Sequence, residues 1–334
     1  MNEALHRTLE STPLHSNWVL AGNTVVVFTT VLAVFLLWFL LELRTARRDG
    51  KLVRSIHPYR RMVPFIMRQR NESVVYFDSQ IRADKLLTFV EQAGSDIRLT
   101  HCIVAALGMT LKENPKMNRF VVGRRLYQRN ESFVTFSMKR TKLDAQSKIA
   151  VVKLAIGPDD CFSDLVEKIN ERIGVERSDA KTHVDRELDF FLQFPRPILN
   201  LAVRFLQGLD YYNLLPASFI RSDGMYTSAF VANLGSLNMD AGYHHLYEWG
   251  NCPLFLMVGA VREEAVVEDG TVVVRKILPL RWSFDERIDD GLTARDGLQT
   301  VQRILEEPDT HLSSSTPVRE DTPEHAEETG AIPG

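Results

Sequence analysis

A charged cluster near the C-terminal end offers side chains suited to proton transfer. Residues 283–291 read Ser-Phe-Asp-Glu-Arg-Ile-Asp-Asp-Gly and lie between an expected strand and an expected helix. Burial could raise the pKa of a carboxyl group such as Glu286 toward neutrality, where it acts as a general base. The same residues also suit a surface turn of salt bridges that caps the helix, because acidic side chains stabilise a helix N-terminus. On residue types alone, the capping interpretation is the simpler one.

A second polar group lies where another expected strand ends. Residues 230–236 read Phe-Val-Ala-Asn-Leu-Gly-Ser and include Ala232 and Asn233. Shortly afterwards comes a histidine pair, of which His245 is a candidate general base because an imidazole has a pKa near neutrality. An exposed or core-satisfied histidine pair is the alternative. Since no further ligands follow at useful spacing, we expect no metal site.

The elements that must position these residues alternate irregularly between strands and helices. Asp269-Gly270 is the strongest hairpin signal in the chain. Thr100 is suited to cap a helix that stops at Pro115, and a last amphipathic helix begins after Gly291 and ends at Pro308. A further helix is expected near residues 84–93, and strands at 73–77, 132–137, 149–156, 226–234 and 254–261. The pattern predicts an α/β fold with a mixed sheet.

A four-residue sequence occurs twice in the chain. Arg70-Asn71-Glu72-Ser73 recurs as Arg129-Asn130-Glu131-Ser132, and each copy opens an expected strand. The similarity ends within a dozen residues. We therefore interpret the recurrence as two similar strand entries rather than as an internal duplication.

The charged cluster strongly resembles the signature S-[FY]-D-H-R-x-x-D-G of the 2-oxo acid dehydrogenase acyltransferase catalytic domain. Residues 230–236 resemble the strand-to-turn element T-I-S-N-L-G of the same family, in the same order and at a similar separation. The resemblance runs from about residue 60 to residue 308. It implies the two-lobed α/β fold of chloramphenicol acetyltransferase, a homotrimer, and a coenzyme A thioester that meets its acceptor at the subunit interface. It also implies that Asn233 and Glu286 come together in the fold.

Two positions depart from the family pattern. In the family the motif histidine removes a proton from the attacking group, a hydroxyl stabilises the oxyanion, and an aspartate orients the neighbouring arginine and the loop. These positions fall on Glu286, Ala232 and Asp290 here, while Asn233 and Arg287 are retained at positions expected to contact substrate. A glutamate has a reference pKa of about 4.3 against about 6.5 for histidine, a deficit of roughly 3 kcal/mol in proton affinity. Losing one oxyanion donor typically costs about 2.7–4 kcal/mol of barrier.

A long apolar segment precedes this domain. Residues 18–41 contain no charged side chain, and about 24 residues rising 1.5 Å each span roughly 36 Å as a helix. The flank before it carries only Arg7, whereas five basic residues crowd the other flank, so we expect the soluble domain to be cytoplasmic. A cleaved signal peptide is the alternative, but the run exceeds the usual apolar core of about 7–15 residues.

The expected organisation follows from these features. We expect a short extracytoplasmic N-terminus at 1–17, a transmembrane helix at 18–41, a basic juxtamembrane linker at 42–59, an acyltransferase-like domain at 60–308 and a disordered tail at 309–334. The net charge of −3 argues against a nucleic-acid partner. The expected partners are the lipid bilayer and an acyl-CoA or acyl-carrier protein, with no lipoyl group in this chain.

Two functions remain open at this point, and a third alternative is an unrelated fold with a chance match to the motifs, which would separate Asn233 from Glu286. The chain is either a membrane-anchored acyltransferase that passes an acyl group from a coenzyme A or carrier thioester to an unknown acceptor, or a catalytically inactive scaffold with the same fold. Glu286 or His245 would serve as the base of the first. The paired departures at Glu286 and Ala232 favour the second.

Overall fold

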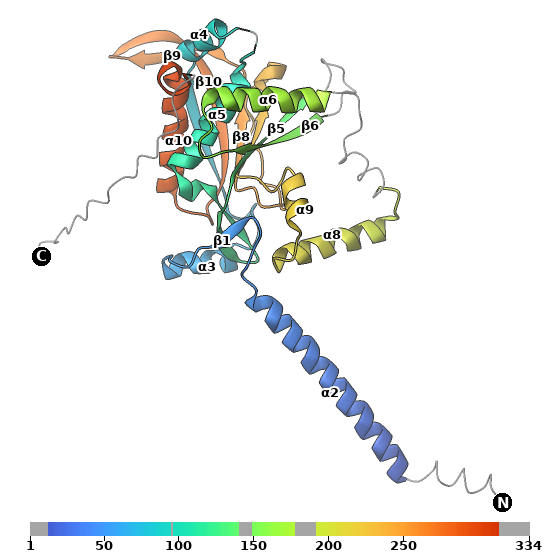
Figure 1. Ribbon diagram of the computed structural model, residues 1–334. Coiled ribbons are helices and arrows are strands. Elements are labelled where there is room, and N and C mark those ends of the chain that lie inside the picture. The colour runs from blue at the N-terminus through green and yellow to red at the C-terminus, as the bar shows by residue number, and fades with distance from the viewer. Residues whose placement is uncertain (1–12, 95, 140–148, 178–191, 314–334) are drawn as a thin grey trace, which may run out of the picture. The chain divides into compact units, whose positions relative to one another are not determined.

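The computed structural model describes residues 13–94, 96–139, 149–177 and 192–313, and the chain divides into two compact units, residues 1–46 and 47–334 (Figure 1). The first unit holds one helix of 31 residues, α2 (Pro13–Leu43). Its segment Thr24–Leu43 is long and apolar enough to cross a membrane. The Thr29 hydroxyl donates to the Val25 carbonyl at 2.9 Å, so this polar group is satisfied within the helix. The expected helix is confirmed, and its insertion in a membrane stays a prediction.

The second unit is built on a large mixed sheet. Its strand order is β2-β10-β8-β7-β5-β6, with β9 paired to β10. The pairs β5 with β7 and β7 with β8 are parallel, and the other pairs are antiparallel, which confirms the expected mixed sheet. The strands are β2 (Val74–Arg82), β5 (Ser132–Lys139), β6 (Ile149–Ile156), β7 (Ala229–Asn233), β8 (Leu254–Val258), β9 (Arg262–Glu268) and β10 (Thr271–Asp285).

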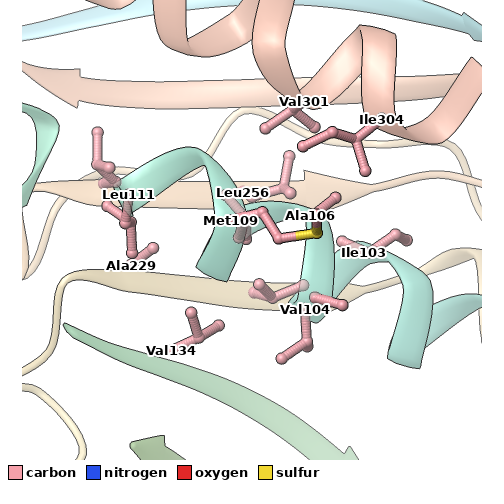
Figure 2. Packing of buried hydrophobic residues seen from close by; sticks show 14 of the residues in the cluster. Ile103, Val104, Ala106, Met109, Leu111, Val134, Ala229, Leu256, Val301 and Ile304 are labelled. Carbon is pink, nitrogen blue, oxygen red and sulfur yellow. The ribbon is translucent and has the colours of Figure 1, made fainter. Parts of the chain in front are cut away.

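A layer of helices covers one face of this sheet. The central helix, α5, contacts β5 and β7 and lies between α6, which packs on β6, and α10, which packs on β2. All residues from His101 to Leu111 of α5 are buried, and Figure 2 shows Val104 and Leu256 among the side chains that fill the space between helix and sheet. The helices are α4 (Asp84–Gln92), α5 (Leu99–Glu113), α6 (Phe162–Arg177), α10 (Gly291–Glu306) and α11 (Pro308–His311), with a 3-10 turn η1 (Pro115–Asn118).

A smaller sheet lies at the end of the domain where the chain enters it. It has the order β1-β4-β3, all antiparallel. The same end carries helices α3 and α8 (Figure 1). These elements are β1 (Gly50–Leu52), β3 (Arg119–Val122), β4 (Arg125–Arg129), α3 (Pro58–Ile66) and α8 (Arg196–Tyr211), followed by α9 (Ala217–Ser222) and a 3-10 turn η2 (Gly235–Leu237).

The boundaries of the domain differ from the expected ones. The segment expected to be a linker, 42–59, lies largely inside the domain, because β1 pairs with β4 and Arg47 is buried against Asp49 and Asp210. The basic residues that suggested a headgroup-facing linker are thus partly used in internal ion pairs. At the other end, α11 and the buried Leu312 belong to the fold, so the expected tail does not begin at residue 309. Residues 314–334 and 1–12 of the expected termini lie outside the described residues.

One helix start differs for a reason that bears on the site. The N-cap of α5 is Arg98, whose backbone N–H donates to the His101 ring at 3.0 Å. Thr100, the expected cap, instead accepts a hydrogen bond from the Asn233 side chain at 3.1 Å. The hydroxyl therefore ties α5 to the end of β7.

Candidate functional site

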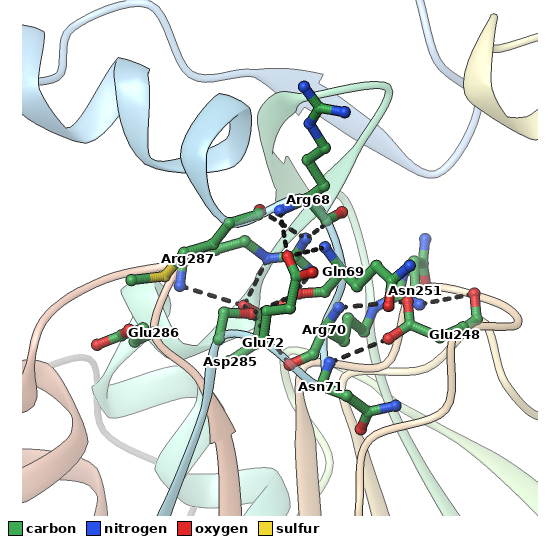
Figure 3. Close-up of polar contacts among 12 residues, drawn as sticks. Arg68, Gln69, Arg70, Asn71, Glu72, Glu248, Asn251, Asp285, Glu286 and Arg287 are labelled. Atoms are coloured by element: carbon green, nitrogen blue, oxygen red, sulfur yellow. Dashed lines mark hydrogen bonds and ion pairs between the residues drawn. The ribbon is translucent and has the colours of Figure 1, made fainter.

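A buried ion pair fixes the start of the charged cluster. Asp285 is the last residue of β10, and Arg287 donates to its two carboxylate oxygens at 2.8 and 2.7 Å. Both side chains are almost fully buried, with 1% and 4% exposed. Arg287 also donates to the carbonyl of Arg68 at 3.1 Å. The interpretation of this cluster as a surface turn of salt bridges is therefore wrong for these two residues, which are core residues (Figure 3).

Between them, the backbone of Glu286 is held from both sides. Its N–H donates to the Ser73 carbonyl at 3.0 Å, and its carbonyl accepts from Arg60 at 2.8 Å. Ser73 also donates its hydroxyl to Asp285 at 3.0 Å. The half-buried Glu286 side chain has no hydrogen bond or ion pair with any residue that the structure describes, and it points away from the network in Figure 3. A rigid backbone thus presents an unpaired carboxylate.

Asp290 has a capping role and an electrostatic one. Its carboxylate accepts from the Thr293 N–H at 3.2 Å, which makes it the N-cap of α10. It also lies 3.7 Å from the Arg60 guanidinium. The expectation that this aspartate orients the neighbouring arginine needs correction, because Asp285 orients Arg287 and Asp290 orients Arg60. The reason is topological: Arg60 enters from α3, 226 residues earlier than the carbonyl it binds.

Ala232 and Asn233 form the end of β7. Asn233 donates to Thr100 and accepts from the Ser236 N–H at 3.2 Å, so its side chain fixes the turn that follows the strand. Ala232 lies opposite Met257 of β8 and brings no hydroxyl to this position. The strand-to-turn element is therefore kept, with its expected oxyanion donor missing.

Within one chain, the ends of β7 and β10 point to different parts of the sheet. Asn233 pairs with Val258, which pairs with Leu280, whereas Glu286 lies six residues after Leu280, directly beyond the end of β10. Six residues of extended strand span about 20 Å. The expectation that Asn233 and Glu286 come together inside one chain is wrong, because the register of β8 against β10 places them at opposite strand ends.

His245 lies in the loop after η2 and is exposed. Its ring lies against Tyr247, with the centroids 5.3 Å apart, and no hydrogen bond or ion pair joins it to Glu286 in the described part of the chain. The neighbouring His244 stacks on Phe255 at 4.1 Å, and burial lowers the pKa of His244 below its usual value. The pair has the properties of the non-catalytic alternative, and a base role for His245 stays a prediction.

Several residues that hold the site gave no local signal. Arg60 and Ser73 act on Glu286 from segments more than two hundred residues away. The repeated sequence Arg-Asn-Glu-Ser did carry information, because both of its arginines are buried and bind consecutive carbonyls. Arg70 donates to Gly250, and Arg129 donates to Asn251.

Chemically, the arrangement offers one free carboxylate and no metal ligand set. Among residues 13–94, 96–139, 149–177 and 192–313, no group of three or more His, Cys, Asp or Glu side chains is placed to hold a metal ion. A carboxylate on a fixed backbone can accept a proton from a hydroxyl or thiol that reaches it. Within one described chain, the end of β7 does not bring a hydroxyl group next to the Glu286 carboxylate.

Comparison with known proteins shows which family and which relatives this chain is similar to. Residues 221–313 match the profile of the 2-oxoacid dehydrogenases acyltransferase (catalytic domain) family. The dihydrolipoyllysine-residue acetyltransferase component of the pyruvate dehydrogenase complex of Bacillus subtilis is 29% identical over 173 residues, which cover 49% of this chain and 35% of the relative. The chain thus spans about a third of the length of that relative.

Solved structures share the fold at low identity. A probable dihydrolipoamide acetyltransferase from Listeria monocytogenes superposes with a TM-score of 0.50 and 16% identity, covering 81% of this chain and 99% of that one. The dihydrolipoamide acetyltransferase of Azotobacter vinelandii, studied for the role of a serine, a histidine and an asparagine in its catalytic mechanism, gives 0.50 and 15%, covering 78% and 95%. The resemblance seen in the sequence is confirmed: residues 221–313 match the model of the acyltransferase catalytic domain, and the chain shares the fold of the dihydrolipoamide acetyltransferase structures.

Proposed function

We propose that this protein is a membrane-anchored acyltransferase, with α2 as the anchor, that transfers an acyl group from a coenzyme A or carrier thioester to an acceptor. Glu286 accepts the proton of the attacking group. One observation carries the proposal: the Glu286 backbone is fixed by Ser73 and Arg60 while its carboxylate has no partner among the described residues. A side chain that only capped α10 would bond to the helix, as Asp290 does.

The site is shared between copies of the chain. Because Glu286 and Asn233 lie at opposite strand ends, a substrate that touches both must bind between two copies. One solved structure that shares the fold is the cubic core of the pyruvate dehydrogenase multienzyme complex. A homotrimer with one site at each interface satisfies this geometry, since head-to-tail contacts close into a ring.

Ala232 favours a second function, namely thioester binding without turnover. The position offers no hydroxyl to an oxyanion, and a missing donor typically costs a factor of about 10²–10³ in rate. In this alternative the domain is a scaffold that keeps the fold and binds an acyl-CoA or acyl-carrier partner at the membrane. The two functions differ in whether a bound thioester is consumed.

The experiment uses the full chain reconstituted in lipid nanodiscs. Coenzyme A binding is measured by calorimetry, and release of free thiol from acyl-CoA esters is measured with a membrane extract as acceptor source. Glu286→Gln keeps the size of the side chain and removes the base, so transfer should fall by about 10²–10⁴-fold with little change in coenzyme A affinity. Ala232→Ser should raise the rate.

The matched control is Glu263→Gln, which changes an exposed glutamate on β9. It should leave both binding and transfer unchanged. Coenzyme A binding with no transfer by the wild-type chain would establish the scaffold function. Transfer that survives in Glu286→Gln would remove Glu286 as the base.

A further inference from the structure

Helix α8 lies at the surface with an uncovered apolar stripe. Its residues Ile198, Leu201 and Phe205 follow helical spacing and are 50%, 69% and 64% exposed. The partly buried Leu206 and Leu209, which lie beside this stripe on the helix, pack against the domain. The helix therefore contacts the domain along one edge of its apolar face and leaves the rest of that face exposed to solvent.

Helix α3, at the same end of the domain, repeats this pattern. Val63 and Pro64 are buried, while Tyr59, Met62 and Ile66 are 66%, 54% and 67% exposed. Figure 1 shows α3 and α8 at the end of the domain opposite the β9–β10 hairpin. Two separate elements thus expose large apolar side chains in one region, which exceeds the scattered exposure usual for a soluble surface.

A basic cavity lies between the two helices. It has a volume of about 350 Å³, and its lining includes Pro64 of α3, Gln207 of α8, and Arg68 and Arg124. Its lining includes Arg287 of the charged cluster but not Glu286, so the cavity lies beside the proposed catalytic carboxylate. The guanidinium of Arg68 points away from the polar network in Figure 3, and that of Arg124 lies over the Phe65 ring at 5.7 Å.

The surface as a whole carries unneutralised positive charge. Five arginines on or beside the two helices have no acidic partner within the described segments, namely Arg61, Arg68, Arg124, Arg196 and Arg204. The one acidic residue of α8, Asp210, is paired with Arg47 at 2.8 Å. Apolar side chains interleaved with arginines suit the boundary between lipid headgroups and acyl chains.

Chain connectivity limits how far the C-terminal end of α8 can lie from the end of α2. Arg47, which pairs with the last turn of α8, follows Leu43 of α2 by four residues, and four residues reach at most about 14 Å. If α2 ends at a membrane surface, the C-terminal end of α8 cannot lie far from that surface.

We propose that the exposed faces of α3 and α8, with the arginines around the cavity, dock onto an anionic lipid bilayer and hold the domain against the membrane. The proposal rests on the anchor role of α2 in the proposed function. A second copy of the chain is the competing occupant. An isologous contact through this surface would bring the same unpaired arginines of both copies together, whereas anionic headgroups neutralise them.

The experiment measures lipid contact in the full chain. Leu201→Cys is labelled with an environment-sensitive fluorophore in a Cys161→Ser background, since Cys102 and Cys252 are buried. The chain is reconstituted in phosphatidylcholine vesicles with or without phosphatidylglycerol, and shallow spin-labelled lipids serve as quenchers. Val272→Cys, 68% exposed against 69% for Leu201, is the matched control on the opposite end of the domain.

We expect lipid quenching to remove most of the emission at position 201 in anionic vesicles and little at position 272. Arg61→Gln and Arg204→Gln should each lower the ratio of docked to undocked domain about fivefold, the value of one cation near an anionic surface. Arg303→Gln, in the C-terminal half of helix α10, should not change it.

Each other outcome counts against the proposal in a distinct way. If lipid quenchers do not reduce the emission at position 201, or if position 201 crosslinks to a second copy of the chain, lipid docking is overturned. Either result leaves the anchor role of α2 untouched. A chain that does not float with vesicles at all overturns the anchor and this proposal together. Thioester transfer measured on the same samples reports separately on the active site.

Discussion

Glu286 takes its properties from residues that surround its backbone rather than from its neighbours in sequence. The motif pattern indicated residues 283–291 as the candidate site, and in the structure Asp285 and Arg287 of this cluster form a buried ion pair. The sequence could not supply Arg60 and Ser73, because their contacts with the cluster depend on how α3 and β2 pack against β10. Residue types predict chemistry here, while tertiary packing decides which groups are free.

Removing one partner of the buried ion pair should be costly. Arg287→Ala leaves the Asp285 carboxylate buried without its cation, and we expect a loss of about 3–5 kcal/mol in unfolding free energy. Denaturant unfolding in detergent, followed by fluorescence of the buried Trp282, measures it. Arg295→Ala, which breaks an exposed pair with Asp296, should cost at most about 1 kcal/mol. Equal losses would show that the buried pair has no special role.

Lys153 predicts a pH dependence of stability. Burial lowers its pKa to about 8, and its ammonium donates to the carbonyls of Ile220 and Asp223 at 2.8 and 3.0 Å. An unfolded lysine has a pKa of about 10.4, so between these values the unfolded chain binds more protons and the folded state gains stability as pH rises. The free energy of unfolding of the wild type, relative to that of Lys153→Met, should therefore rise from about pH 8 to 10.5 and stay constant below that window. A constant difference throughout would contradict the lowered pKa.

At the level of elements, local patterns predicted the strands of the large sheet but not the three strands of the smaller sheet or helices α6 and α8. The turn Asp269-Gly270 joins β9 and β10 as expected, with φ of 50° and 77° at its two residues. Helix α8 was not predicted, although its apolar residues follow helical spacing, and none of its residues is fully buried. Thr100 was read as a cap, yet its hydroxyl serves Asn233 from another element. Hydrogen bonds of this kind, between side chains of different elements, leave no periodic pattern in the sequence.

The hairpin offers a test of its turn conformation. Gly270 has a positive φ and open space around it, so Gly270→Ala should cost about 1 kcal/mol through backbone strain alone. Gly291, at the first position of α10, also has open space but no positive φ. Gly291→Ala should be neutral or slightly stabilising, because alanine favours a helix. Thermal unfolding of both variants provides the comparison, and a neutral Gly270→Ala would argue against this turn.

For the whole molecule, the fold class and the family resemblance were predictable, and the separation of the site was not. The two motifs, at residues 230–236 and 283–291, are short and continuous in sequence, so both parts of the candidate site could be recognised from the sequence. Their distance in space follows from the register of β8 and β10, which no local pattern specifies. Because of this separation, we propose that Asn233 and Glu286 meet between two copies of the chain rather than within one copy.

The most direct test of the shared acyltransferase site is complementation between two inactive chains. Glu286→Gln and Asn233→Ala chains are purified separately and as a co-expressed mixture, and acyl transfer from acyl-CoA is measured in nanodiscs. If each site takes Glu286 from one copy and Asn233 from the next, random 1:1 assembly restores about a quarter of the sites. We predict that the mixture regains transfer that neither variant shows alone. A mixed assembly as inactive as its components would contradict a site shared in this way.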